Sequence, residues 1–195
     1  MKTRDRILEA SRELFNVEGV GPLSAVDIAS ALNISAGHLY YHFKGKPQIL
    51  AELLAMHQRE VEMVLEAMRE ACAARPDIET LWTHVHILVE EAWDARFFWR
   101  EPALALGNEA VAAAARRVMT SLVSGLGDVL KRLHEAGAIR AKAEARDGLA
   151  GQLATGIVFH AIALTLRGDT GPPRELVARA AAQVMLPAAG LANRP

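Results

Sequence analysis

Residues 24–46 read SAVDIASALNISAGHLYYHFKGK, and this stretch holds two short helical patterns joined by a tight turn. Ser24 can cap the first helix, because its hydroxyl can accept a hydrogen bond from an early backbone N–H. Asp27, three residues later, suits the positive first turn. An apolar face at helical spacing follows, formed by Ile28, Ala29 and Leu32. The pattern predicts a short helix with this face turned inward.

Asn33 and Ile34 predict the turn, since Asn tolerates a left-handed backbone and Ile34 can lie between the two helices. Ser35 is a second N-cap, and the next helix is expected over about residues 36–43. Its inner residues recur at spacings of three and four: Leu39, Tyr40 and Phe43. The other side is left to Gly37, His38, Tyr41 and His42. Such hydrogen-bonding groups suit DNA phosphates, on a helix thin enough to enter a major groove.

The stretch resembles the DNA-binding domain of the tetracycline-repressor (TetR) family of bacterial transcriptional regulators. LYYHFKGK at residues 39–46 is its most specific part, and the resemblance covers about the first 50 residues. The phosphate-binding residues that it implies are Ser24, His38, Tyr40, Tyr41, His42 and Lys46. Ala36 and Gly37 are implied to approach base edges, and we include the N-cap Ser35 in the predicted DNA-binding set.

Two positions depart from the usual pattern of that family. Ala36 stands where a long polar or basic residue is common, so base reading is expected to use apolar contact with thymine, close main chain at Gly37 and DNA shape. His38 replaces what is commonly a small polar residue, and it can reach bases as well as phosphate.

The same residues also allow a plainer interpretation. The inner side chains could be ordinary core, Lys44 and Lys46 a solvated helix end, and His38 with His42 two ligands of a metal. A metal needs a third ligand, and no Cys, Asp or Glu falls nearby on that face. The complete order of cap, turn, cap and aromatic residues favours the DNA-binding interpretation.

Composition predicts an all-α protein. The chain has 195 residues, of which 51% are hydrophobic and only 5% aromatic, with much Ala and Leu. A net charge of −1 excludes a bulk polycation, so any positive DNA-binding surface must be local. The single cysteine, Cys72, excludes an intramolecular disulfide and agrees with a cytoplasmic location. Charges throughout residues 1–15 argue against a signal peptide.

The predicted architecture is an N-terminal three-helix helix-turn-helix DNA-binding head followed by a C-terminal helical ligand-binding and dimerisation body. Its expected boundaries are residues 1–46 for the head, 47–187 for the body and 188–195 for a loose tail. Outside the helix-turn-helix, helices are expected over residues 2–18, 47–74, 78–95, 108–136, 144–166 and 174–186. The helix from residue 47 leaves the head and can transmit movement to it.

Residues 144–166 are apolar nearly all round, so this helix must be covered on both sides. Two copies of the chain could cover it through a four-helix contact that also uses residues 174–186, which predicts a homodimer. A membrane span is the alternative, because residues 148–166 are uncharged and long enough. Polar residues and three glycines inside it favour a buried helix of a soluble dimer.

Several large side chains of the body could line a cavity for a largely apolar small molecule. They are Trp82, His86, Trp93, Phe97, Phe98, Met119, Val123 and His160. The same residues at helical spacing could simply be core. His86 could share a metal with Glu90 or Glu91, although such a pair is more often structural. Motifs for nucleophilic catalysis and phosphate or dinucleotide binding are missing, so we expect no enzyme and no cofactor.

The resemblance implies a homodimer that binds a pseudo-palindromic operator in double-stranded DNA and is released by a small-molecule effector. Two alternatives stay open. One is a DNA-binding dimer without an effector, and the other is a helical enzyme or ligand carrier with a vestigial head.

Overall fold

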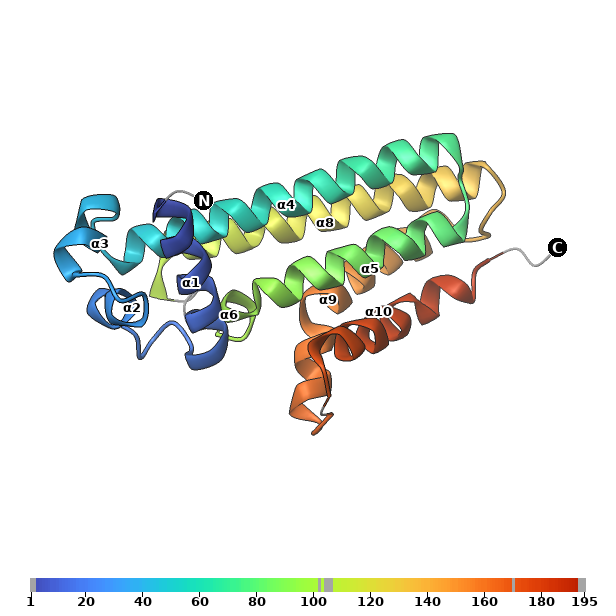
Figure 1. The fold of residues 1–195 in the computed structure, drawn as a ribbon. Coiled ribbons are helices and arrows are strands. Elements are labelled where there is room, and N and C mark those ends of the chain that lie inside the picture. Colours follow the sequence, from blue (N-terminus) through green and yellow to red (C-terminus); the bar gives the residue numbers. More distant parts are fainter. Residues whose placement is uncertain (1–2, 102, 104–106, 170, 193–195) are drawn as a thin grey trace. The chain divides into compact units, whose positions relative to one another are not determined.

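A computed structural model describes residues 3–101, 103, 107–169 and 171–192. These residues are mostly helical, which confirms the all-α prediction, and an isolated β-bridge joins Ile139 to Ala192. The helices (Figure 1) are α1 Thr3–Glu18, α2 Ala25–Ala31, α3 Ala36–His42, α4 Lys46–Ala74, α5 Ile78–Asp94, α6 Arg96–Trp99, α8 Glu109–Glu135, α9 Ala143–Leu166 and α10 Pro173–Ala189.

The chain forms two compact units, and α4 and α8 each contribute to both. The N-terminal unit comprises residues 1–58 and 94–115, and the C-terminal unit comprises residues 59–93 and 116–195. The boundary between head and body at residue 46 stays a prediction. The N-terminal unit continues into α4 and also takes in α6, a helix that the sequence pattern assigned to the body.

Within the N-terminal unit, α1 packs against α2 and α6, and α2 packs against α3 (Figure 1). The apolar stripes converge on a small core whose largest fully buried side chains are Ile7, Phe15, Ile28, Leu39, Phe43, Ile49 and Phe97. This core fixes how the two helices of the helix-turn-helix cross, and it leaves the opposite face of α3 uncovered.

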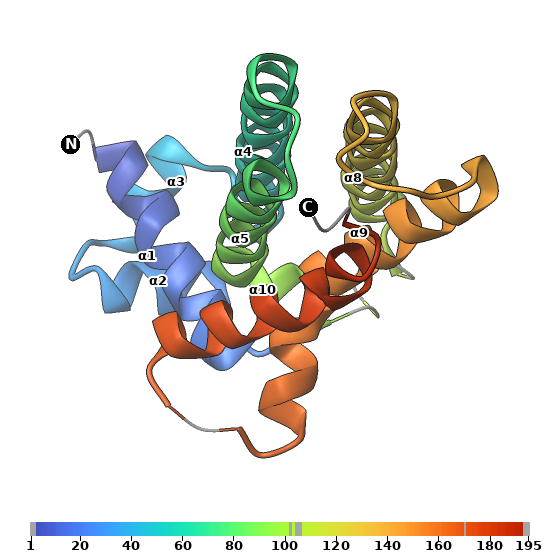
Figure 2. The same ribbon diagram turned by 90° about the vertical axis from the view of Figure 1, so that its right-hand side faces the viewer.

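The C-terminal unit is a helix bundle in which α9 and α10 lie side by side (Figure 2). Two glycines mark close helix approaches in it. A Cβ built on Gly125 of α8 would lie 2.9 Å from Leu65 of α4, and one built on Gly156 of α9 would lie 2.9 Å from Val184 of α10. Close packing of small residues therefore brings these helices together.

Residues 188–192, the described part of the expected tail, are structured. Helix α10 runs through Pro187 to Ala189, and Ala188 is buried. Proline near the end of a helix removes only one backbone hydrogen bond, so the last turn can persist. Arg140 N then donates to Leu191 O at 3.1 Å, next to the bridge at Ala192.

Helix α9 is long and apolar enough to cross a membrane by length and composition alone. Its apolar window has a mean hydropathy of 1.6. One such helix is weak evidence for a span, because core helices of soluble proteins meet the same criterion. Leu149, Leu153 and Ile157 are buried on one side of α9, and Ala154 and Val158 are buried beside them.

Candidate nucleic-acid interface

The first helix of the helix-turn-helix begins with a complete capping box. Ser24 Oγ accepts from Asp27 N at 3.3 Å, and Asp27 Oδ2 accepts from Ser24 N at 2.8 Å. The Ser24 hydroxyl also donates to Asp27 Oδ2 at 2.6 Å. These hydrogen bonds, that of the hydroxyl first, lower the pKa of Asp27 because they favour its carboxylate. The predicted start of α2 is confirmed.

The turn and the second cap also agree with the sequence pattern. Asn33 has a φ of 53°, the left-handed conformation that Asn tolerates. Ile34 N returns to Ala29 O at 3.0 Å. Ser35 Oγ then accepts from His38 N at 3.1 Å and caps α3. Phe43 adopts an extended φ of −140° and ends the helix. The two helices are therefore set by local hydrogen bonds.

Helix α3 presents most of the predicted DNA-binding residues to solvent. Tyr41 is 82% exposed and Tyr40 50%, so Tyr40 does not join Leu39 and Phe43 in the core as its spacing had suggested. Gly37 and His38 are exposed, whereas Ala36 and His42 are half-buried. The His42 ring lies 5.4 Å from that of His38 and 5.1 Å from that of Tyr41, between centroids. The exposed face of α3 therefore carries polar rings and, next to them, Gly37, which has no side chain.

Lys46 lies in the first turn of α4, as predicted, but its amine contacts the protein itself. Lys46 Nζ donates to Val20 O at 2.8 Å and lies 3.4 Å from Gly21 O. Glu101 Oε1 accepts from Val20 N at 2.7 Å. The loop between α1 and α2 is therefore held from both sides, and the phosphate contact of Lys46 stays a prediction.

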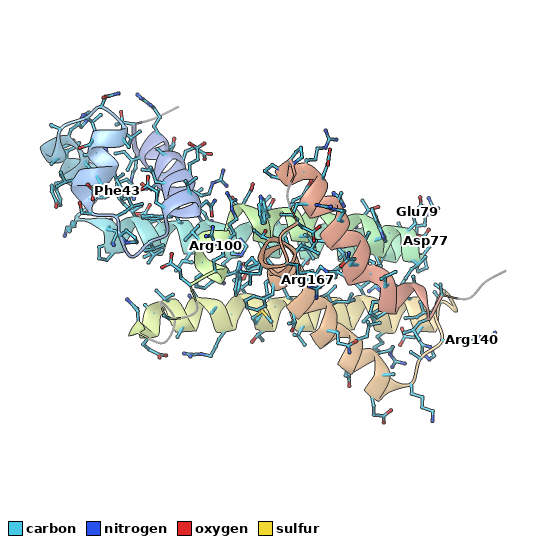
Figure 3. The ribbon with its side chains drawn as sticks, turned by 90° about the horizontal axis from the view of Figure 1, so that it is seen from below. Phe43, Asp77, Glu79, Arg100, Arg140 and Arg167 are labelled. Carbon is cyan, nitrogen blue, oxygen red and sulfur yellow. The ribbon has the colours of Figure 1, made fainter. Side chains whose placement is uncertain are left out.

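Arg4 links the start of α1 to the exit of α3. Its guanidinium lies 4.7 Å from the centroid of the Phe43 ring, a cation–π contact, and it pairs with Glu52 of α4. Phe43 is labelled in Figure 3. The Arg4–Glu52 ion pair is partly exposed, so we expect it to orient these side chains more than to stabilise the fold.

Asn16 of α1 binds residues 94–100, the segment that follows α5. The sequence pattern did not predict this attachment. Its side chain donates to Asp94 O at 2.8 Å and accepts from Phe97 N at 2.9 Å. Its carbonyl accepts from Arg100 Nη1 at 3.0 Å; Arg100 is labelled in Figure 3. Asn16 supplies the cap that α6 lacks within its own sequence. A polar residue on the buried side of α1 was the only signal.

The residues predicted to bind a ligand are divided between the two units. Phe97 and Phe98 are buried in the N-terminal unit, where the Phe97 ring lies 5.9 Å from that of Phe15. The remaining six belong to the C-terminal unit. Trp82 and His86 are together in α5, with stacked rings 5.5 Å apart, and Trp82 is 41% exposed. A shared cavity stays a prediction.

The other predicted ligand-binding residues lie on three helices. Trp93 of α5 and Met119 of α8 are half-buried, and Val123 of α8 is exposed. His160 of α9 bonds through Nε2 to Gln183 Oε1 of α10 at 2.6 Å. His86 Nε2 lies 3.5 Å from Glu90 Oε1. Among the described residues, no three His, Cys, Asp or Glu side chains gather in a way that could hold a metal.

The sequence pattern places His57 on the apolar side of the helix from residue 47, but it does not predict the partner of this histidine. His57 of α4 is only 3% exposed, and its Nε2 accepts from Trp99 Nε1 at 3.3 Å. Burial lowers the pKa of His57 to about 4 because the imidazolium loses its hydration. His57 is therefore neutral at physiological pH, with its proton on Nδ1.

Two family models match the chain. That of bacterial regulatory proteins of the tetR family covers residues 7–53, and that of a bacterial transcriptional repressor covers residues 56–190. The regulator SrpR of Pseudomonas putida is 36% identical over 62 residues, 32% of this chain and 29% of that protein. A probable acrEF/envCD operon repressor of Escherichia coli is 32% identical over 66 residues, 34% of this chain and 30% of that protein.

These sequence matches span about a third of the relatives' length, whereas structural similarity extends over nearly the whole chain. A TetR-family transcriptional regulator of Marinobacter aquaeolei has a TM-score of 0.85 and 26% identity, over 99% of this chain and 92% of that one. Both family models describe regulators, in agreement with the expectation that the chain is not an enzyme. The chain belongs to the TetR family of bacterial transcriptional regulators.

Proposed function

We propose that the protein is a homodimeric, sequence-specific DNA-binding repressor that a largely apolar small molecule releases from its operator. The observation that carries the proposal is the outer face of α3, where Tyr40, Tyr41 and His38 are exposed on a helix whose caps and turn are complete. An amphipathic helix that merely covers a core would present smaller or charged residues there.

On DNA, α3 would enter the major groove. The side chains assigned to phosphates are Ser24, His38, Tyr40, Tyr41, His42 and Lys46, and Ala36 and Gly37 would face base edges. Ser24 and Ser35 already cap helices, so their contribution is to hold the N-terminal N–H groups toward phosphate. Lys46 would have to leave Val20 O or share its protons with a phosphate.

The dimer would form through residues 144–166 and 174–186. Leu166 of α9 and Leu186 of α10 are strongly exposed, and Phe159, two turns before Leu166 in α9, is also exposed. A second copy that covers these side chains would remove apolar surface from water. Two recognition helices related by a twofold axis would read a pseudo-palindrome with half-sites ~34–36 Å apart.

The effector would bind among the large side chains of the body, which include the stacked rings of Trp82 and His86. Binding would shift the population toward a conformation in which α4 no longer holds the recognition helices at operator spacing. Such a repressor acts on DNA in the cytoplasm. The similarity to the probable acrEF/envCD operon repressor of Escherichia coli supports repression as the sign of regulation.

The test is selection of DNA from a random library by the purified protein, followed by gel shift on the selected sequence. We expect a palindromic consensus and binding that weakens steeply with salt. The absence of sequence-selective binding would contradict the proposal. If operator binding is found but no small molecule alters it, the effector-independent alternative holds.

A further inference from the structure

Val20, in the loop between α1 and α2, has both of its main-chain polar groups bonded to charged side chains. It is only 2% exposed. Its N–H donates to Glu101 Oε1 at 2.7 Å, and its carbonyl accepts from Lys46 Nζ at 2.8 Å. Hydrogen bonds to ionised groups are roughly twice as strong as those between neutral groups. A carboxylate and an ammonium, 81 and 26 residues away in sequence, therefore fix this loop from two sides.

The glycines on either side of Val20 leave room for the Glu101 carboxylate. Gly19 ends α1 with a φ of 88°, and its N–H donates to Phe15 O at 3.0 Å. A Cβ built on Gly19 would lie only 2.7 Å from Glu101 Oε1, and one built on Gly21 would lie 4.0 Å from Oε2. Glycine at position 19 is therefore needed both for the turn and for the close approach of the carboxylate.

Lys46 takes its position from this loop. Its amine bonds to Val20 O and lies 3.4 Å from Gly21 O, which leaves at least one of its three protons for another acceptor. The four-carbon stem of a lysine is flexible, so an amine that is already held in place loses less entropy when it binds a phosphate. Whatever fixes Val20 therefore also fixes the charge that the proposed function assigns to a DNA phosphate.

We propose that Glu101 is a positioning residue for operator binding. Its carboxylate holds Val20, and Val20 holds the amine of Lys46 where it meets the phosphate. Glu101 acts through these contacts and not by touching DNA. The inference rests on the proposed DNA binding and adds to it a residue far outside the helix-turn-helix. The sign of its effect is distinctive, because a carboxylate that acted only through its charge would repel phosphates, and its loss would strengthen binding.

Two conservative variants of Glu101 separate the reach of its side chain from its charge. Glu101→Gln keeps an oxygen that can accept from Val20 N–H, so the full-length protein should bind the selected operator about as tightly as wild type. Glu101→Asp keeps the charge on a shorter side chain. It should bind about tenfold more weakly, the loss expected when one lysine of each protomer is no longer held, and Glu101→Ala should show the same loss. Glu13→Ala, which removes an exposed carboxylate of α1, is the matched control and should not weaken binding.

The salt dependence of binding shows whether Glu101 acts through Lys46. Lys46→Ala should reduce the slope of log affinity against log salt by about one for each protomer, because one phosphate contact is lost. Glu101→Ala should reduce the slope similarly, although it removes no positive charge. In the Lys46→Ala background, Glu101→Ala should cause no further loss of affinity. Fluorescence anisotropy on the selected operator, at several salt concentrations, measures these quantities.

The outcomes separate this role of Glu101 from the proposed function. A wild-type protein that selects no DNA sequence contradicts the proposed function itself. If the wild type selects an operator, but Glu101→Gln tightens binding and Glu101→Asp leaves it unchanged, the charge of Glu101 acts directly and the positioning role is wrong. Equal losses from Glu101→Ala with and without Lys46 would also overturn it, because Glu101 would then support only the fold. Should Glu101→Ala not fold, the comparison of Glu101→Asp with Glu101→Gln decides.

Discussion

The N-terminal unit and the C-terminal pair α9–α10 are stabilised in different ways. In the N-terminal unit, side chains such as Ser24, Ser35 and Asn16 fix helix ends and loops by directed hydrogen bonds. In contrast, α9 and α10 begin without a side-chain cap and contact each other mainly through small and apolar residues, with one side-chain hydrogen bond between His160 and Gln183. Hydrogen bonds have a preferred direction, so they hold the exposed face of α3 in one geometry. Apolar packing has no preferred direction, so it allows helices to shift against each other.

The sharpest test of this difference is the loss of Asn16. Asn16→Leu leaves Phe97 N–H without its partner at a buried site, and Asp94 C=O without its partner at a partly buried one. We expect the free energy of unfolding to fall by about 4 kcal/mol, from two unsatisfied groups of ~1–3 kcal/mol each. Urea denaturation measures it, with Val17→Ala, at a strongly exposed site next to it, as the control. A loss as small as that of Val17→Ala would mean that the bonds of Asn16 contribute nothing.

Acid should destabilise the protein through His57. Its pKa is about 4 in the fold against 6.5 ordinarily, so only the unfolded chain binds the proton between these values. Stability should therefore fall as the pH drops from 6.5 to 4, by roughly 3 kcal/mol from this group. His57→Gln keeps an acceptor for Trp99 and does not titrate. The two proteins should differ in the slope of unfolding free energy with pH, and equal slopes would contradict the assignment.

Packing should dominate in the C-terminal pair. Gly156→Ala would bring a Cβ to 2.9 and 3.2 Å from the two methyl groups of Val184, a stiff β-branched side chain. We expect a loss of about 2 kcal/mol from overpacking. Gly151→Ala, in the same helix with no atom within 4 Å, should instead be neutral or stabilising. If both variants behave alike in thermal unfolding, α9 and α10 are not closely packed at Gly156.

The smallest expected effect is at the cap of α3. Ser35→Ala removes the acceptor for His38 N and should cost ~1 kcal/mol. Ser35→Asp keeps an acceptor there, so it should retain stability while it weakens operator binding by repelling phosphate. Circular-dichroism melts give the first quantity and gel shifts the second. Equal melts for the two variants would show that the cap contributes little.

The sequence predicted the helix-turn-helix well because its signals are local. A cap and its donor are three residues apart, and Asn33 carries its own conformational preference. The attachment of Asp94 and Phe97 to α1 was missed because Asn16 meets them from 78 and 81 residues away. Lys46 looked like a free cation, because none of its neighbours in sequence shows that its amine bonds to the carbonyl of Val20. The last helix, expected over residues 174–186, continues through Pro187 to Ala189, because one lost hydrogen bond in a last turn is tolerated.

The attachment of residues 94–101 to α1 also bears on protein engineering. A fragment that stops at Gln58 would contain Asn16, Val20 and His57 but none of the groups that they bond in Asp94, Phe97, Trp99 and Glu101. A fusion of the first 58 residues to another protein would therefore carry a destabilised DNA-binding head. A transferable version would need residues 94–101 grafted beside α1, or apolar substitutions for Asn16 and His57 that no longer require them.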